Sequence, residues 1–289
     1  MYTGIYISSL DKKLSINCNG NLLNLSTPKI MGILNITPDS FYDGGKFSDV
    51  KNAVNQTNKM LSDGADIIDI GAVSSRPGAD LLSFEEEKNR LKPILKELSK
   101  EFKNTIFSLD TFRADIAEYF VNEYGISIIN DISAGELDSK MFETIGKLNV
   151  PYIMMHMQGV PGNMQNNPKY TNITLEIIKY FAKKVSIAKQ IGINDIIIDP
   201  GFGFGKTLDD NYKLLKKLKD FEILELPILV GISRKSMIYK QLETSADNAI
   251  TGTIAANTIA LLNGANILRV HDVKEANDCI KIVNKQSEV

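Results

Sequence analysis

Short apolar runs and longer amphipathic stretches alternate along most of the chain. Eight runs rich in Ile, Val, Leu or Met end in polar residues, at 30–37, 65–72, 105–111, 126–133, 150–157, 193–201, 227–233 and 265–273. Such runs are typical of strands buried on both faces of a parallel sheet. Stretches with helical periodicity follow them, at 50–61, 84–102, 113–124, 141–148, 171–191, 208–218, 246–262 and 274–284. Ser83 and Glu86 predict a capping box at the start of 84–102, and Gly192 predicts the end of 171–191. The pattern therefore predicts eight strand–helix units.

Two folds repeat strands and helices in this way. Eight units in about 260 residues are the usual size of a (β/α)8 TIM barrel. The alternative, a doubly wound open sheet, usually has fewer strands and favours a Gly-rich fingerprint after its first strand, where the segment 35–39 reads NITPD instead. We expect one α/β barrel domain at 26–289. Asn19-Gly20 predicts a β-hairpin in an N-terminal extension, 1–25, that covers the bottom of the barrel.

Composition favours a globular protein that acts on small molecules. The 289 residues are 43% hydrophobic and 24% charged, and the net charge of -2 provides no basic field for nucleic acid or an anionic membrane. The sequence shows no apolar run of membrane-spanning length and no signal peptide. Cys18 and Cys279 have no metal-ligand spacing; they suit a reducing cytoplasm, although a disulfide stays open. We expect a cytoplasmic protein.

Polar side chains close the predicted strands, where a barrel of this kind builds its active site. Asp69 belongs to the second strand, and Asp110, Asn130 and Asp199 end the third, fourth and sixth. The oxygens of Asp110, Asn130 and Asp199 suit the N–H edge of a flat heterocycle. Any one of them could be only a helix cap, but a polar end on all eight strands exceeds what capping requires.

Cationic side chains gather in the second loop and on the last two strands: Arg76, Lys235, Arg269 and His271. They suit a phosphate or pyrophosphate, which barrels often bind near strands seven and eight. Arg269 and His271 are two residues apart and share one face of their strand, which favours a common anion over the alternative of a surface salt bridge. Asn35 and Asp39 offer the hard oxygen ligands that Mg²⁺ prefers.

Three other sequence features give weaker evidence of function. Gly205-Lys206-Thr207 ends like a P-loop, but the first glycine of that motif would fall on Pro200. Ser233 lacks a nucleophile elbow, so a serine nucleophile is not expected. His156 is either a functional group or a satisfied polar residue near the rim.

The strand-end segments resemble the signatures of the dihydropteroate synthase family. They are MGILNITPDSFYDGG at 31–45, DIG at 69–71 with SSRPG at 74–78, LDT at 109–111, IND at 129–131, MHMQG at 155–159 with Pro161, DPGFGFGK at 199–206, GISRKS at 231–236 and RVHD at 269–272. The resemblance covers about 30–273. One departure is Ala72-Val73, where a Gly-Glu pair is often found.

This resemblance implies a Mg²⁺-assisted, SN1-like condensation of 6-hydroxymethyl-7,8-dihydropterin diphosphate with p-aminobenzoate, which yields 7,8-dihydropteroate and pyrophosphate. It implies pterin binding by Asp110, Asn130, Asp199 and Lys235. It implies diphosphate binding by Asn35, Ser75, Arg269 and His271, with Mg²⁺ on Asn35. It implies p-aminobenzoate binding by Arg76, Phe204, Lys235 and Ser236. It implies catalytic roles for Asp110, Asp39, Arg76 and Lys235.

The same resemblance implies inhibition by sulfonamides and a homodimer. The apolar segment 250–262 could serve the dimer interface, but packing in the core explains it as readily. Two other functions stay open: a methyltetrahydrofolate-binding methyltransferase barrel and a pterin-binding module without catalysis.

Overall fold

The computed structural model describes residues 14–36, 46–72, 82–159, 162, 164 and 168–288. Eight parallel strands pair in the order β8-β7-β6-β5-β4-β3-β10-β9. Their bounds are β3 (Lys29–Asn35), β4 (Ile67–Gly71), β5 (Ile106–Asp110), β6 (Ile128–Asp131), β7 (Tyr152–Met155), β8 (Ile196–Asp199), β9 (Leu229–Val230) and β10 (Ile267–Val270). A parallel bridge between Ile198 and Ile228 joins β8 to β9 and closes the sheet. The predicted TIM barrel is confirmed.

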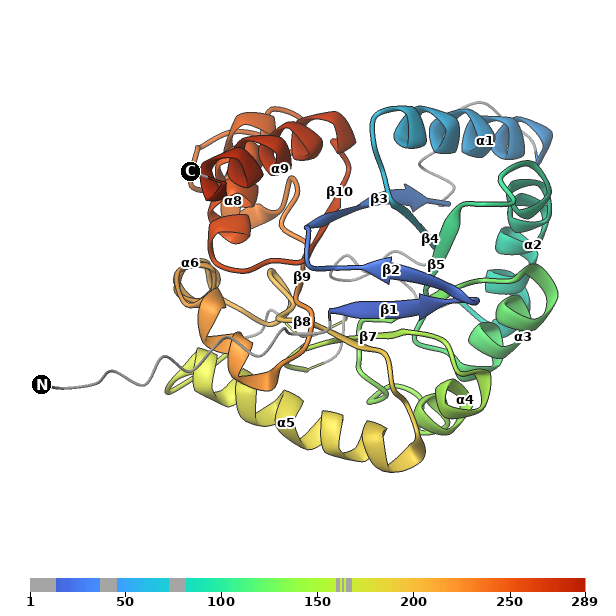
Figure 1. The fold of residues 1–289 in the computed structure, drawn as a ribbon, viewed down its shortest axis with the longest axis horizontal. Coiled ribbons are helices and arrows are strands. Elements are labelled where there is room, and N and C mark those ends of the chain that lie inside the picture. The colour runs from blue at the N-terminus through green and yellow to red at the C-terminus, as the bar shows by residue number, and fades with distance from the viewer. Residues whose placement is uncertain are drawn as a thin grey trace, which may run out of the picture.

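Helices surround the barrel (Figure 1). They are α1 (Lys46–Ser62), α2 (Phe84–Glu101), α3 (Ala114–Tyr124), α4 (Met141–Leu148), α5 (Ile173–Ile191), α6 (Leu208–Lys216), α8 (Ile250–Leu262) and α9 (Val273–Ser287). All eight match predicted stretches. Sequence reasoning missed the 3₁₀ helix η2 (Leu218–Leu224) and the short α7 (Ser236–Tyr239). It also started the seventh helix too early, because 246–249 form turns before Ile250.

Local signals at the helix ends are confirmed. Ser83 accepts a hydrogen bond from the Glu86 N–H at 3.3 Å, and the Glu86 carboxylate accepts one from the Ser83 N–H at 2.9 Å. This reciprocal pair is the predicted capping box at the start of α2. Gly192 ends α5 in the left-handed conformation, with φ +93°, which glycine adopts without steric cost.

An apolar layer fills the end of the barrel where the strands begin. It consists of Met31, Ile67, Ile128, Ile153, Ile197, Leu229 and Ile267. The hairpin of β1 (Ser15–Cys18) and β2 (Asn21–Asn24) packs Ile16 and Cys18 against this layer. Asn19 and Gly20 both have positive φ, as a tight hairpin turn requires. The hairpin lies across the end of the barrel nearest the viewer in Figure 1, so the predicted covering of the bottom is confirmed.

A polar layer lies above the apolar one inside the barrel. Alternate residues of a strand share a face, so the residues two positions after the apolar layer also point inward. On β4, β5, β6, β8 and β10 these are the polar residues Asp69, Ser108, Asn130, Asp199 and Arg269, of which Asp69, Ser108, Asn130 and Asp199 are buried. The barrel therefore changes from apolar to polar along its axis, toward the ends of the strands.

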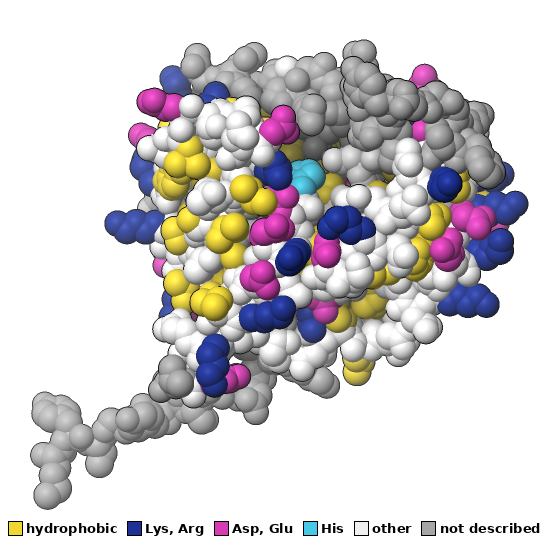
Figure 2. Space-filling model, turned by 90° about the horizontal axis from the view of Figure 1, so that it is seen from above, with side chains coloured by type: hydrophobic (Ala, Val, Ile, Leu, Met, Phe, Trp, Pro, Cys, Tyr) yellow, Lys and Arg dark blue, Asp and Glu magenta, His cyan; other side chains and the backbone are white. Residues whose placement is uncertain are grey.

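Cys18 and Cys279 are both buried and free, so the disulfide that the sequence left open is absent. Within the described ranges, no helix is long and apolar enough to cross a membrane. Charged side chains of both signs are scattered over the face in Figure 2, and hydrophobic side chains gather at its left, where Figure 1 places α8 and α9. The exposed large hydrophobic residues of these two helices are Ile254, Ile259, Leu262 and Ile282.

Candidate active site

Arg269 lies at the centre of the polar layer. Its Nε donates to Asp69 Oδ2 and its Nη2 donates to Asp110 Oδ2, each at 2.7 Å. Asn130 Nδ2 donates to the same Asp69 oxygen at 3.0 Å. These contacts join β4, β5, β6 and β10 across the interior. Arg269 is thus ion-paired inside the barrel and not on its surface.

Burial dominates the electrostatics of this cluster. It raises the pKa of the Asp110 carboxyl to about 7, although Arg269 opposes the rise and the charge of Asp69 adds to it. Burial also opposes the charge on Arg269, but the carboxylates of Asp69 and Asp110 outweigh it and hold the pKa of Arg269 above its ordinary value. Asp69 Oδ1 and Ser108 Oγ are buried and find no hydrogen-bond partner among the described residues. Both oxygens could therefore form a hydrogen bond with a ligand in the barrel.

Lys235 forms a second cluster with the loop after β8. Its Nζ donates to the Phe202 carbonyl at 2.6 Å and lies 4.6 Å from the centroid of the Phe204 ring. Burial lowers the pKa of Lys235 to about 8 and raises the pKa of the nearby Asp199, whose Oδ1 accepts a bond from the Gly201 N–H at 2.8 Å. Ser236 follows Lys235 as the first residue of α7.

His271 and Asn35 lie at the rim, at the ends of β10 and β3. The His271 N–H donates to Ser233 Oγ at 3.2 Å, and the ring Nδ1 lies 3.3 Å from the same oxygen. Both His271 and Asn35 are exposed. Asp39, Ser75 and Arg76 lie outside the described residues, so their predicted roles stay predictions.

Comparison with known proteins assigns the family. Residues 31–271 match the model of the pterin binding enzyme family. The chain is 41% identical over 272 residues to dihydropteroate synthase of Escherichia coli K12, covering 93% of this chain and 95% of that protein. Its identity to the Haemophilus influenzae dihydropteroate synthase is 42%, over 93% of this chain and 98% of that protein. The chain belongs to the dihydropteroate synthase family.

Solved structures of dihydropteroate synthases agree with this assignment. One from Yersinia pestis, in complex with a sulfonamide drug, superposes with a TM-score of 0.89 at 40% identity, over 96% of this chain and all of that one. Another from Xanthomonas albilineans, with 4-aminobenzoic acid, gives 0.88 at 34% identity, over 96% of this chain and 99% of that one. The predicted family is confirmed, and with it the prediction of a transferase.

The sequence indicated no role for two buried residues of the candidate site. Asp69 is fully buried and binds both Arg269 and Asn130. Lys206 is buried beside Phe204, where its Nζ donates to the Phe204 carbonyl at 2.9 Å. A carboxylate between isoleucines in a buried strand was the signal for Asp69. For Lys206 the sequence offered only the failed P-loop pattern.

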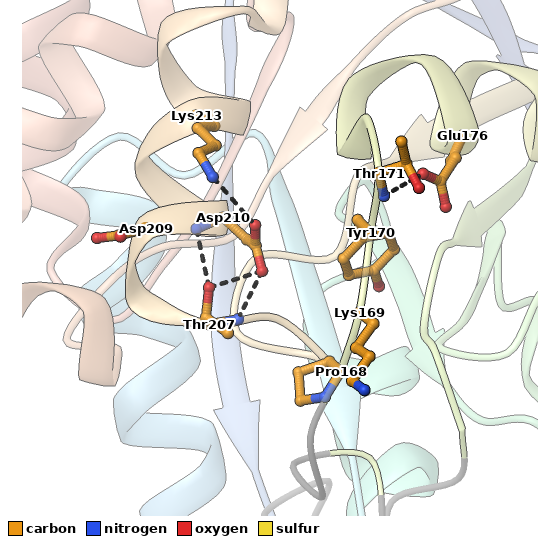
Figure 3. Close-up of a pocket in the computed structure, with 9 residues that line it drawn as sticks. All are labelled: Pro168, Lys169, Tyr170, Thr171, Glu176, Thr207, Asp209, Asp210 and Lys213. Carbon is orange, nitrogen blue, oxygen red and sulfur yellow. Dashed lines mark hydrogen bonds and ion pairs between the residues drawn. The ribbon is translucent and has the colours of Figure 1, made fainter.

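A surface pocket of about 550 Å³ lies between the segment before α5 and the start of α6 (Figure 3). Its polar groups bind one another. Asp210 accepts from Thr207 Oγ1 at 2.6 Å, and Glu176 accepts from the Thr171 N–H at 2.8 Å. None of its lining residues belongs to the strand-end clusters, so the pocket is separate from the candidate active site.

Proposed function

We propose that this chain condenses 6-hydroxymethyl-7,8-dihydropterin diphosphate with p-aminobenzoate to form 7,8-dihydropteroate and pyrophosphate. The observation that carries the proposal is the meeting of two clusters at the polar end of the barrel: the carboxylates around Arg269 and the Lys235–Phe204 contact. Family membership, and similarity to a relative whose structure holds 4-aminobenzoic acid, support the pair of substrates.

The pterin ring is assigned to Asp110, Asn130, Asp199 and Lys235. Buried carboxylates are the natural acceptors for ring N–H groups, since each can accept several hydrogen bonds. Asp199 uses one oxygen for the Gly201 N–H, which leaves the other for the ligand. Lys235 would donate to an acceptor of the ring in place of the Phe202 carbonyl.

The diphosphate is assigned to Arg269, His271 and Asn35, with Mg²⁺. A guanidinium has five N–H donors, and Asp69 and Asp110 take one each, so the other donors of Arg269 are available to phosphate oxygens. No group of three or more acidic, His or Cys side chains in the described part of the chain forms a metal cage. The Asn35 amide oxygen together with diphosphate oxygens is a donor set that fits Mg²⁺, which would neutralise charge on the leaving pyrophosphate.

The reaction begins with the separation of charge between the pterin and the leaving pyrophosphate. Departure of pyrophosphate leaves a methylene cation conjugated with the dihydropterin ring, and the Asp110 carboxylate offsets this positive charge. Arg269 stabilises the negative charge of the leaving group. The arylamine is neutral at pH 7 and already nucleophilic, so no strong general base is required. The catalytic roles of Asp39 and Arg76 and the binding of diphosphate by Ser75 stay predictions, because these residues lie outside the described ranges.

A turnover assay tests the proposal. Incubation with pterin diphosphate, p-aminobenzoate and Mg²⁺ should yield dihydropteroate and pyrophosphate, and sulfonamides should compete with p-aminobenzoate. Binding of the pterin diphosphate without turnover would identify a non-catalytic binding module. Formation of methylated product with methyltetrahydrofolate as donor would identify a methyltransferase.

Asp199→Asn tests the pterin assignment directly. The variant keeps the shape of the side chain and loses its charge, so we expect the KM for the pterin diphosphate to rise about tenfold, the effect of losing one charge-assisted hydrogen bond. Asp195→Asn, at an acid near the start of β8, is the matched control and should keep wild-type values. A wild-type KM in Asp199→Asn would remove Asp199 from the pterin site.

We also propose a cytoplasmic homodimer. The two buried free thiols suit a reducing compartment. The apolar side chains exposed on α8 and α9 suit an interface between copies. Sedimentation equilibrium should give twice the 32.0 kDa mass of the chain. Leu262→Glu, which places a charge on this face, should give the monomer mass.

A further inference from the structure

Lys206 is a buried cation to which the proposed chemistry assigns no role. Only 3% of its surface is exposed. Its Nζ lies 3.1 Å from His156 Nδ1, 3.2 Å from the His156 carbonyl oxygen and 2.9 Å from the Phe204 carbonyl oxygen. An ammonium has three N–H donors, so these three acceptors satisfy it completely. Burial of this kind is costly and requires such partners.

The loop that contains Lys206, residues 201–206, lies directly on the end of β7. A Cβ atom on Gly201 would be 2.0 Å from the His156 carbonyl oxygen, and one on Gly205 would be 2.5 Å from the Gln158 carbonyl oxygen. The Tyr170 hydroxyl, from the segment drawn in Figure 3, donates to the Gly205 carbonyl at 2.8 Å. Two separate chain segments are therefore held in backbone contact, and Lys206 binds both.

The same loop carries the Phe204 ring. This ring packs in a buried cluster that includes Met155 at the end of β7, and it faces Lys235 Nζ. The cluster fixes the ring, and Lys206 fixes the carbonyl of the same residue. A shift of the 201–206 loop would therefore move Phe204 relative to Lys235.

The contact between Lys206 and His156 survives a change of protonation. Burial lowers the pKa of Lys206 to about 7, while Asp199 and Asp210 oppose the fall and the charge of Lys235 adds to it. Burial and the charge of Lys206 lower the pKa of His156 to about 2, so the ring is neutral. A charged Lys206 donates to Nδ1. A neutral amine can accept from Nδ1–H in the other tautomer and still donate to two carbonyls.

We propose that Lys206 is a positioning residue for p-aminobenzoate: it anchors the 201–206 loop on His156 and so sets the place of Phe204. The inference rests on the proposed function, because it uses the p-aminobenzoate role given to Phe204. A lysine that only stabilised the fold would affect both substrates alike. Lys206 binds the carbonyl of Phe204 itself, whereas the hydrogen bond to the pterin residue Asp199 comes from Gly201, at the other end of the loop.

Lys206→Met tests this, with Lys184→Met as the matched control. Lys184 on α5 also donates to a loop carbonyl, that of Ala134 at 2.9 Å, but it has no contact with Phe204. In Lys206→Met we expect the KM for p-aminobenzoate to rise about tenfold, and the KM for the pterin diphosphate to stay within about twofold. Lys184→Met should change neither KM. Parallel rises in both KM values, or none, would overturn the proposal.

Two further variants distinguish a loss of positioning from a general loss of folding. His156→Phe provides a ring for the edge-to-face contact with Tyr180, which has 4.9 Å between ring centroids in the wild type, and removes the nitrogen partner of Lys206. It should raise the KM for p-aminobenzoate alone, by about threefold. In a Phe204→Ala background, Lys206→Met should add nothing to that KM, since Lys206 acts through Phe204; full additivity would contradict the mechanism. Lack of turnover in the wild-type protein would instead refute the proposed function.

Discussion

One carboxylate oxygen of Asp69 accepts hydrogen bonds from both Arg269 and Asn130. The charge of Asp69 also contributes to the raised pKa of Asp110, after burial, the largest cause. Asp69 thus acts on the site in two ways: it orients Arg269, and it makes the neighbouring carboxyl easier to protonate.

Asp69→Asn should move the acid limb of the pH profile. Asp110 must be ionised to offset the developing cation, so kcat/KM is expected to rise with pH through about 7 in the wild-type protein. Removal of the negative charge of Asp69 lowers the pKa of Asp110, and the limb should move to lower pH. The profile of kcat/KM for the pterin diphosphate measures the shift. Ser108→Ala, at the neighbouring buried position on β5, should leave the limb in place, and an unmoved limb in Asp69→Asn would exclude this coupling.

The sequence predicted which polar residues line the candidate site, but it did not predict which of them bind one another. Polar strand ends indicated Asp110, Asn130, Asp199 and Arg269, and the structure brings three of them into one network. The partners of Arg269 are 159 and 200 residues away along the chain. Spacing within a strand cannot reveal such pairs, because they depend on the inclination of the strands in a closed barrel.

At the scale of elements, Glu87 connects α2 to the end of β5. It is fully buried, and its Oε1 accepts a bond from Thr111 Oγ1 at 2.9 Å, while Oε2 lies 3.5 Å from Arg113 Nε. Burial raises the pKa of Glu87 to about 7, against the opposing effects of Thr111 and Arg113. The folded state therefore binds a proton more tightly than the unfolded state.

This linkage predicts that the contribution of Glu87 to stability falls as pH rises. Between its ordinary pKa of 4.5 and the folded value of about 7, Glu87 holds its proton more often in the folded state than in the unfolded chain, so its contribution to the free energy of unfolding decreases with pH across that window and stays low above it. Glu87→Gln cannot ionise. It should be more stable than the wild type at pH 8 by roughly 1–3 kcal/mol, as urea unfolding at pH 5 and pH 8 can measure. Glu101→Gln, exposed on the same helix, is the control. An equal pH dependence in Glu87→Gln and the wild type would refute this account.

The start of the seventh helix was misplaced because a contact from elsewhere in the chain determines it. The seventh helix starts at Ile250 and not near 246, because Arg234 donates to the carbonyls of Ala246 and Asp247 at 3.1 and 2.6 Å. A side chain from the loop after β9 thus binds carbonyls that a helix would use internally. Periodicity along one segment does not contain that information, whereas the capping box of Ser83 and Glu86 is local and was predicted correctly.

At the scale of the whole molecule, the residues that stabilise the barrel and the residues of the candidate site lie at opposite ends of its axis. The apolar layer and the hairpin close one end, and the polar network occupies the other. Repeated strand–helix units of the right number predicted this architecture, and the alternating positions within each strand set the two layers. The sequence did not predict which residues of different strands lie at the same height along the axis, because that depends on the register between strands.

Ile16→Ala should destabilise the protein without changing catalysis. Ile16 is buried between the hairpin and the apolar layer, so the substitution should cost about 2–4 kcal/mol through lost burial and a cavity. Both KM values should stay at wild-type levels, because the hairpin lies at the opposite end of the barrel from the polar layer. Leu22→Ala, at a residue 74% exposed on the same hairpin, should be nearly neutral. A change in KM with Ile16→Ala would show that the two ends are coupled.

The seam of the barrel has a consequence for its motion. β9 has two residues and meets β8 at the Ile198–Ile228 bridge, whereas β3 and β4 pair at five positions. Amide protons along this thin part of the wall should exchange with deuterium sooner than those of β3 and β4, because fewer bonds must open. Lys235, which follows β9, donates across the seam to Phe202 after β8. A ligand that takes Lys235 from the Phe202 carbonyl, as proposed for the pterin, would remove this bond across the seam, so the exchange rate in the wall beside it would report whether the site is filled.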